Sequence, residues 1–322
     1  MAYQEEVGTS PDDVINKIAV FAQANGWTVD RNTLSGSNRT LTVHKSGDYI
    51  HIYNINTTRI FMRGSVGYNA ANPPSTQPNV SNAATCSPEA GPYTKIYMFA
   101  DDLPTEHVFI VIETAGGILY HLCFGMIEKF GTFTGGTFFD ASCWTRSTSQ
   151  VYTWNSSHHA LFDSGQGSGF SSAEVGGSIR CDIPADGLTN NWARLAADTA
   201  GSNNPRIQCG LNAGTSESSN EKSWLTTLAY SRNDPPFSGQ PSLGTIRAHV
   251  VREGTSDFWS PIGTIPNIRY LRMQRYSSGQ EITIGTDVWK IFPMARYGVG
   301  TNNGSPNNVF SEYHGYAYKK VV

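Results

Sequence analysis

The chain of 322 residues has few charged side chains and no strongly basic segment. Asp, Glu, Lys and Arg make up 15% of it, well below the roughly 25% of an average soluble protein. Its 23 cations are scattered among 26 anions, and the longest run of cations is Lys319-Lys320. Nucleic-acid grooves and anionic membrane surfaces require several cations on one face. We therefore expect neither a nucleic acid nor a membrane among its partners.

The sequence also lacks long apolar runs. No stretch of about 18 apolar residues occurs, which excludes a membrane-spanning helix. Residues Met1 to Ser10 are polar and acidic, without the basic and apolar regions of a secretory signal. We therefore expect the protein to be made and to fold in a cytoplasm.

Cysteine is scarce and widely spaced. The odd number, 5, argues against a disulfide framework, and no C-x-x-C pair suggests a zinc knuckle or a thioredoxin-type redox site. We expect reduced thiols, some of them buried as small hydrophobic groups. The cysteines are Cys86, Cys123, Cys143, Cys181 and Cys209.

Turn-forming and neutral polar residues are abundant. The chain holds 32 Gly, 16 Pro and 23 Asn, while 39% of its residues are hydrophobic and 11% aromatic. The hydrophobic fraction excludes an intrinsically disordered chain. The whole composition predicts a β-rich protein with long loops. Its surface is expected to expose more amide and hydroxyl groups than charged groups.

Residues 1–68 are predicted to form an N-terminal α+β domain. Ser10-Pro11-Asp12-Asp13 is a typical helix start, with a hydroxyl cap, proline in the first turn and acids near the positive end. An apolar stripe follows and Asn25-Gly26 ends the helix. Short strands of a small antiparallel sheet are then predicted at Trp27 to Asp30, Thr40 to His44, Tyr49 to Asn54 and Arg59 to Val66.

Residues 69–92 are predicted to be a loop or linker, and residues 93–322 a larger β-sandwich-like domain. Loops of that length in a compact chain are usually functional or intersubunit. The main domain is predicted to contain a loop-rich insertion at about 146–222, with a short helix at Asp186 to Asp198. Its predicted strands are Tyr93 to Phe99, His107 to Thr114, Ile118 to Phe124, Trp224 to Ser231, Gly244 to Arg252, Ile265 to Met273, Glu281 to Ile284, Val288 to Phe292 and Tyr313 to Val322.

Several residues are candidates for catalytic groups. Ala141-Ser142-Cys143-Trp144 resembles the local signature of a papain-type nucleophile, but no His follows at the required distance. Asp101-Asp102 and Glu106 could form a carboxylate pair, although they flank a turn, where Asp is favoured for turn hydrogen bonds. Gly165-Gln166-Gly167-Ser168-Gly169 lacks the Lys of a phosphate-binding loop. We assign no catalytic or cofactor-binding residue.

Histidines and aromatics give no convergent site either. His158-His159 with Asp163 could bind a metal, yet adjacent strand residues point to opposite faces. His44 could lie opposite His51 across one hairpin, and His107 opposite His121 across another. Such pairs could bind a metal, but we assign no metal ligand. Exposed aromatics in neutral surroundings suit sugars and protein interfaces equally. These aromatics are Tyr152, Trp154, Trp259 and the Tyr313 to Tyr318 segment.

The order of the motifs resembles a group of tailed-bacteriophage virion proteins. The resemblance covers most of the chain except roughly 146–240. It is carried by the 10–13 helix start and by Ala24-Asn25-Gly26-Trp27-Thr28-Val29-Asp30-Arg31, Ala90-Gly91-Pro92-Tyr93, His107-Val108-Phe109-Ile110-Val111, Phe124-Gly125, Phe130-Gly131-Thr132-Phe133-Thr134-Gly135-Gly136, Trp289-Lys290-Ile291-Phe292-Pro293 and Gly315-Tyr316-Ala317-Tyr318-Lys319-Lys320. The resemblance implies a structural component of tail, baseplate or neck, present in several copies in the virion and assembled in the bacterial host cytoplasm.

Three functional hypotheses follow. The first is a non-enzymatic structural virion protein whose partners are copies of itself and other virion proteins. The second is a carbohydrate- or receptor-binding protein at the tail tip, with a host surface glycan as its partner. The third is a depolymerase or peptidase using Asp102 or Cys143. No cofactor or metal is expected.

Overall fold

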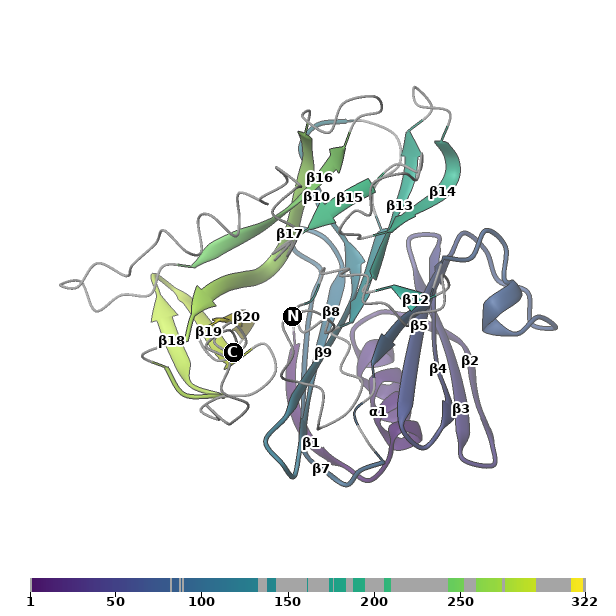
Figure 1. Ribbon diagram of the computed structural model, residues 1–322, viewed down its shortest axis with the longest axis horizontal. Coiled ribbons are helices and arrows are strands. Elements are labelled where there is room, and N and C mark those ends of the chain that lie inside the picture. Colours follow the sequence, from purple (N-terminus) through teal and green to yellow (C-terminus); the bar gives the residue numbers. More distant parts are fainter. Residues whose placement is uncertain are drawn as a thin grey trace, which may run out of the picture.

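The computed structural model is an α+β protein that is mainly β, with one N-terminal α-helix and three sheets among the described residues (Figure 1). The predicted fold class, a helix on a small antiparallel sheet followed by a larger sandwich-like body, is confirmed. The structure describes residues 2–81, 83–86, 88, 90–132, 138–142, 161, 174–175, 177–183, 188–194, 206–209, 243–251, 259–273, 276–293 and 314–320.

Helix α1 spans Pro11–Ala24 and begins where the sequence predicts. Its cap is Ser10, whose side-chain oxygen accepts a hydrogen bond from the backbone N–H of Asp13 at 3.4 Å. At the other end, the side chain of Asn25 donates to the carbonyl of Phe21 at 2.8 Å. The predicted apolar stripe is buried between two sheets and consists of Val14, Ile15, Ile18, Phe21 and Ala22.

The N-terminal sheet has six strands in the order β12-β6-β5-β4-β3-β2. The four strands predicted for residues 27–66 are confirmed as β2 to β5, joined as successive antiparallel neighbours. Residues 83–86 of the predicted loop form a further strand, β6, which pairs with β5. The bounds are β2 Thr28–Ser35, β3 Asn38–Lys45, β4 Asp48–Asn56, β5 Arg59–Ser65, β6 Ala83–Cys86 and β12 Glu174–Val175.

The central sheet has seven strands in the order β1-β7-β8-β9-β11-β13-β14. β8 is buried on both faces, as its continuous apolar run predicts. The helix predicted at 186–198 is wrong, because residues 188–194 form β14 and pair with β13. The bounds are β1 Ala2–Gly8, β7 Tyr93–Asp101, β8 His107–Thr114, β9 Leu119–Met126, β11 Phe138–Ser142, β13 Gly177–Ile183 and β14 Leu188–Arg194.

The C-terminal sheet contains seven strands and packs on the other face of the central sheet. The predicted hairpin of residues 281–292 is confirmed as β18 and β19. Its order is β15-β16-β17-β20-β19-β18, with β10 paired to β17. The bounds are β10 Glu128–Lys129, β15 Arg206–Cys209, β16 Gly244–Val251, β17 Trp259–Arg272, β18 Glu281–Ile284, β19 Asp287–Pro293 and β20 His314–Lys320.

β1 joins the first residues of the chain to the predicted main domain, because it pairs antiparallel with β7. No strand is predicted for Ala2–Gly8 from the sequence. The division into units at 1–68 and 93–322 stays a prediction. Cys86 and Cys123 are buried and carry no disulfide bond, as expected for them.

Gly91, which lies just before β7, packs closely against the backbone of Thr9 and Ser10 at the start of α1. Its φ is +90°, and a Cβ there would lie 2.4 Å from the carbonyl oxygen of Thr9. Only glycine tolerates both the backbone conformation and the contact. The motif Ala90-Gly91-Pro92-Tyr93 therefore has a structural role, which is to lead the chain from the N-terminal sheet past α1 into β7.

Candidate interaction site

The connection between β5 and β6 is the most distinctive surface feature of the N-terminal sheet. We call residues 66–81 the projecting loop, because they extend from that sheet away from the central sheet (Figure 1). At its base, the backbone N–H of Val66 donates to the carbonyl of Pro78 at 3.2 Å, and that of Ser81 donates to the carbonyl of Gly64 at 2.8 Å. No Asp, Glu, Lys or Arg occurs between Arg63 and Glu89. The loop is therefore a neutral projection with a hydrogen-bonded base.

A buried amide closes the projecting loop from inside. Gln77 is 3% exposed, and its side-chain oxygen accepts the backbone N–H of Asn69 at 2.8 Å. Its side-chain nitrogen donates to the carbonyls of Asn69 at 3.0 Å and Asn72 at 2.8 Å. Asn72 in turn donates from its side chain to the carbonyl of Thr76 at 3.0 Å. The loop, which includes the 3₁₀ turn η1 (Pro74–Thr76), thus has its conformation set by its own amides.

Arg31 on β2 anchors the loop to the sheet. Its Nη1 donates to the carbonyl of Asn72 at 3.0 Å, and its Nη2 donates to the carbonyl of Ala70. The guanidinium also lies over the ring of Tyr68, 5.3 Å from its centroid. Tyr68 in turn stacks near Tyr49 on β4, with the ring centroids 6.1 Å apart. One cation therefore holds both the tip and the stem of the loop.

His51 lies beneath this arrangement and is fully buried. Its Nδ1 is 3.0 Å from the hydroxyl oxygen of Thr42, and its Nε2 is 2.7 Å from that of Ser65. Burial, together with the weaker effect of the charges of Arg31 and Arg63, lowers the pKa of His51 to about 4. His51 is thus a neutral hydrogen-bonding group at physiological pH.

The structure does not bring His44 and His51 together as a pair. His44 is opposite Tyr49 in the ladder, whereas His51 is opposite Thr42. The Nδ1 of His44 lies 2.6 Å from a carboxylate oxygen of Asp30 on β2. The two histidines therefore have separate partners.

His107 and His121 are likewise separated, because His107 is opposite Gly125 and His121 is opposite Val111. His121 is fully buried between the central and C-terminal sheets, 2.6 Å from the hydroxyl of Tyr318 and 3.0 Å from the carbonyl of Pro293. Burial lowers the pKa of both histidines to about 4, although backbone acceptors oppose the shift. Neither side chain is placed for metal binding with the other.

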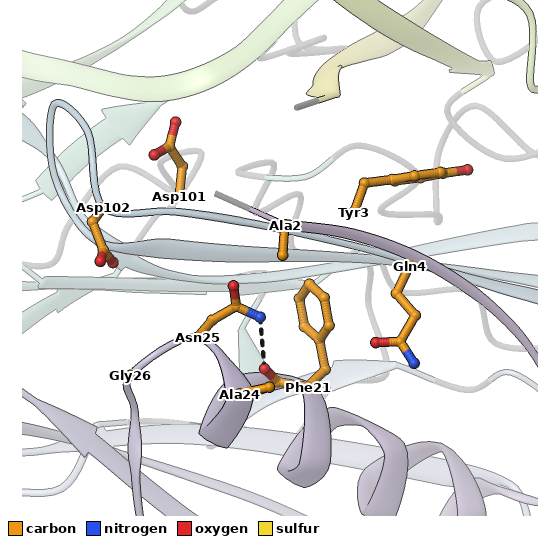
Figure 2. A pocket seen from close by; sticks show the side chains of 9 residues that line it. All are labelled: Ala2, Tyr3, Gln4, Phe21, Ala24, Asn25, Gly26, Asp101 and Asp102. Carbon is orange, nitrogen blue, oxygen red and sulfur yellow. Dashed lines mark hydrogen bonds between the residues drawn. The ribbon is translucent and has the colours of Figure 1, made fainter. Parts of the chain in front are cut away.

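Two of the candidate catalytic carboxylates, Asp101 and Asp102, line a pocket of about 520 Å³. It lies between the start of β1, the end of α1 and the end of β7. Figure 2 shows Asp101 and Asp102 on opposite sides of the end of β7, with Phe21 and Asn25 below. The pocket lies at the C-terminal end of α1, where the helix dipole is negative. Its surroundings therefore favour positive charge.

Both carboxylates already accept hydrogen bonds from groups on neighbouring elements. Asp101 accepts the side-chain amide of Asn267 at 2.8 Å and the backbone N–H of Leu103 at 3.0 Å. Asp102 accepts Lys45 Nζ at 2.6 Å, and that ammonium also donates to the carbonyl of Asn25 at 3.3 Å. These contacts tie β7 to the C-terminal sheet on one side and to the N-terminal sheet on the other.

Glu106, the third carboxylate, accepts a hydrogen bond from the hydroxyl of Ser46 at 3.0 Å. It therefore links the turn after β7 to the turn between β3 and β4. The three acids connect layers of the fold, each through a partner of its own.

A charged cluster that the sequence did not indicate joins β1 to the C-terminal sheet. Lys290 is 7% exposed, and its Nζ lies 3.1 Å from Glu5 Oε1 and 3.3 Å from Glu281 Oε1. Lys95 reaches the other oxygen of Glu5 at 3.3 Å, and Lys320 reaches Glu281 at 2.9 Å. The five residues come from different strands, so only the assembled fold could place them together.

Tyr3 completes this cluster. Its hydroxyl donates to Glu5, and the ammonium of Lys320 lies 4.8 Å from its ring centroid. Burial raises the pKa of Tyr3 above its usual range. Burial alone would raise the pKa of Glu5 as well, but the hydrogen bond from Tyr3 and the charge of Lys290 lower it to about 2.

The prediction that the Tyr313 to Tyr318 segment exposes aromatics is wrong for two of its tyrosines. Tyr316 is 2% exposed and Tyr318 is fully buried, both in the core between the central and C-terminal sheets. The side chain of Trp259 lies outside the described residues. So do the remaining candidates, which are Cys143, His158, His159, Asp163, the 165–169 segment, Tyr152 and Trp154.

Within the described part of the chain, no group of three or more His, Cys, Asp or Glu side chains gathers as metal ligands would. Among the same residues, no helix is both long and apolar enough to cross a membrane. No known protein family and no curated protein matches the sequence.

Proposed function

We propose that the protein is a non-enzymatic structural component of a tailed-bacteriophage virion, located in the tail, baseplate or neck. It acts by symmetric self-association and by contact with other virion proteins, after assembly in the cytoplasm of the bacterial host. The resemblance of its motifs to such proteins supports this proposal, and so does the low charge of the chain.

The observation that carries the proposal is the projecting loop. Its polar interior is already hydrogen-bonded through Gln77, so little conformational entropy is lost when a partner covers it. It carries no ionic side chain of its own, so burial of its side chains in an interface does not require desolvation of a charge on the loop. A rigid, neutral projection suits an intersubunit contact better than it suits a solvated surface.

The proposal is tested with the purified full chain and with particles of the phage that encodes it. We expect light scattering to show a defined oligomer and mass spectrometry of particles to find the protein in several copies. A strictly monomeric protein that is missing from particles would contradict the proposal.

A matched pair of variants tests the loop. Ala71→Asp places a charge on the exposed part of the loop, whereas Ala115→Asp places the same charge on the exposed turn between β8 and β9. We expect Ala71→Asp to reduce incorporation into particles and Ala115→Asp to leave it unchanged. Equal incorporation of both variants would show that the loop is not an intersubunit contact.

A further inference from the structure

β2 is an open edge of the N-terminal sheet. It is eight residues long, Thr28–Ser35, and pairs with β3 on one side. Among the described residues, no strand pairs with its other side, and Figure 1 shows β2 at the outer margin of the sheet. An open edge presents backbone N–H and C=O groups to which another strand can bond.

Soluble proteins usually protect such an edge with lysine, proline or outward-directed charge. β2 has neither lysine nor proline. Its two charged side chains, Asp30 and Arg31, are already bonded within the chain, to His44 and to the carbonyls of the projecting loop. Among the described residues, a bulge between Val29 and Arg31 is the one protective feature of this edge, and it affects only the first part of the strand.

The surface beside the edge is neutral and partly apolar. Leu34 of β2 is 52% exposed, and Val20 of α1 is 58% exposed. Asn32 donates from its side chain to that of Asn16 at 3.1 Å, which links β2 to the helix one turn before Val20. Leu34, two residues after Asn32, lies on this same face of the strand. A partner at the edge would therefore cover exposed apolar groups on the helix side of the sheet.

We propose that β2 pairs antiparallel with β2 of a second copy of this chain across a two-fold axis. The N-terminal sheets of the two copies then form one continuous sheet, with α1 of each copy on one face and the projecting loops on the other. The strand carries one acid and one base side by side, so two identical strands meet without net repulsion. The proposal rests on the proposed function, of which it names one self-association surface.

The main test uses Leu34→Lys, which places a charge beside the paired strands. Since Leu34 is half exposed in the single copy, the substitution is compatible with folding, and circular dichroism checks this. We expect the dissociation constant of the two-copy species, measured by light scattering or sedimentation, to rise by about tenfold or more. Leu103→Lys is the control, because Leu103 is 65% exposed on the turn after β7 and lies on neither β2 nor its partner strand β3. It should leave the dissociation constant unchanged.

Hydrogen exchange of the unmodified protein provides a second readout. Amides of residues 28–35 should become slower to exchange as the protein concentration rises through the association range, because pairing protects them. An oligomer that persists in Leu34→Lys, with no added protection of β2, would overturn this inference and leave self-association intact. A protein that stays monomeric at all concentrations would also overturn it, while its presence in particles decides the proposed function separately.

Discussion

The side chain of Gln77 hydrogen-bonds both backbone groups of Asn69, accepting its N–H at 2.8 Å and donating to its C=O at 3.0 Å. One buried side-chain amide therefore makes the two backbone hydrogen bonds that a neighbouring strand makes in a sheet. It does so in a loop segment that pairs with no strand. Neutral amides can fill this role at a buried position where an ionised group could not. The side-chain amides of Asn72 and Gln77 thus have a structural use in this loop.

Gln77→Ala should loosen the projecting loop. The substitution removes the acceptor of the backbone N–H of Asn69, and an unsatisfied buried donor costs about 1–3 kcal/mol. It also removes one donor from each of the carbonyls of Asn69 and Asn72, which keep the N–H of Asn72 and the guanidinium of Arg31 as partners. We expect the loop to open, with faster proteolysis and faster amide exchange in residues 69–77. Gln23→Ala, on an exposed position of α1, is the control and should change neither. An unchanged loop in Gln77→Ala would show that its other contacts, such as those of Arg31, are sufficient to set its conformation.

Gly91→Ala and Gly47→Ala separate two costs of replacing glycine. Both glycines have φ near +90°, but a Cβ at Gly91 meets the carbonyl of Thr9 at 2.4 Å, whereas nothing lies within 4 Å at Gly47. Gly47→Ala should cost about 1 kcal/mol, from backbone conformation alone. Gly91→Ala should cost about 3 kcal/mol or more, because the start of α1 must also shift. Urea unfolding measures both, and equal losses would contradict the contact.

Acid should destabilise the protein between pH 6.5 and pH 4. Burial lowers the pKa of His51, His107 and His121 to about 4 in the folded state, against an ordinary value of 6.5. In this window the unfolded chain binds more protons than the folded one, so stability is present above pH 6.5 and is lost as the pH falls. Each histidine contributes at most about 1.4 kcal/mol per pH unit.

The pH dependence is measured by urea unfolding at pH 7 and pH 5. We expect a lower free energy of unfolding at pH 5, and a smaller difference between the two values in His51→Asn, which removes one of the three groups. A free energy of unfolding that is equal at the two pH values would contradict the burial of these histidines.

Lys290→Met and Lys95→Met test what the charged cluster contributes. Both lysines contact Glu5, at 3.1 Å and 3.3 Å, but the side chain of Lys290 is 9% exposed and that of Lys95 is 49% exposed. Exposed pairs contribute little, so Lys95→Met should change stability by less than about 1 kcal/mol. Lys290→Met leaves Glu5 and Glu281 without their most buried cation and should cost about 3 kcal/mol. Thermal unfolding distinguishes them, and similar melting temperatures would show that burial of Lys290 is unimportant.

Elements with a strong local pattern were predicted correctly. The cap at Ser10 and the apolar stripe after it specify α1, and the turns of the β8–β9 and β18–β19 hairpins lie between clear runs of strand-forming residues. β1 was missed because Ala2–Gly8 is polar and its partner β7 is distant in sequence. The helix predicted over β14 is wrong although Leu, Ala and Arg favour a helix locally, because pairing with β13 overrides that preference.

For the candidate site, the length of 69–92 predicts a functional or intersubunit loop, and this stays a prediction. The closure by Gln77 and the anchor at Arg31 could not be predicted from the sequence. The same limit applies to Tyr316 and Tyr318, whose neutral neighbours suggested exposure. Burial of a strand depends on which sheet covers it, and neighbours in sequence carry little information about that.

Composition and short-range pattern were thus sufficient for the class of fold, the helix and most strands, because helix caps, turns and alternation act over a few residues. Tertiary structure alone decided the packing order of the three sheets, the bonding of Asp101 and Asp102 to neighbouring sheets and the open edge at β2. These features depend on contacts between residues that are far apart in the chain, and such contacts form only when the sheets are packed together.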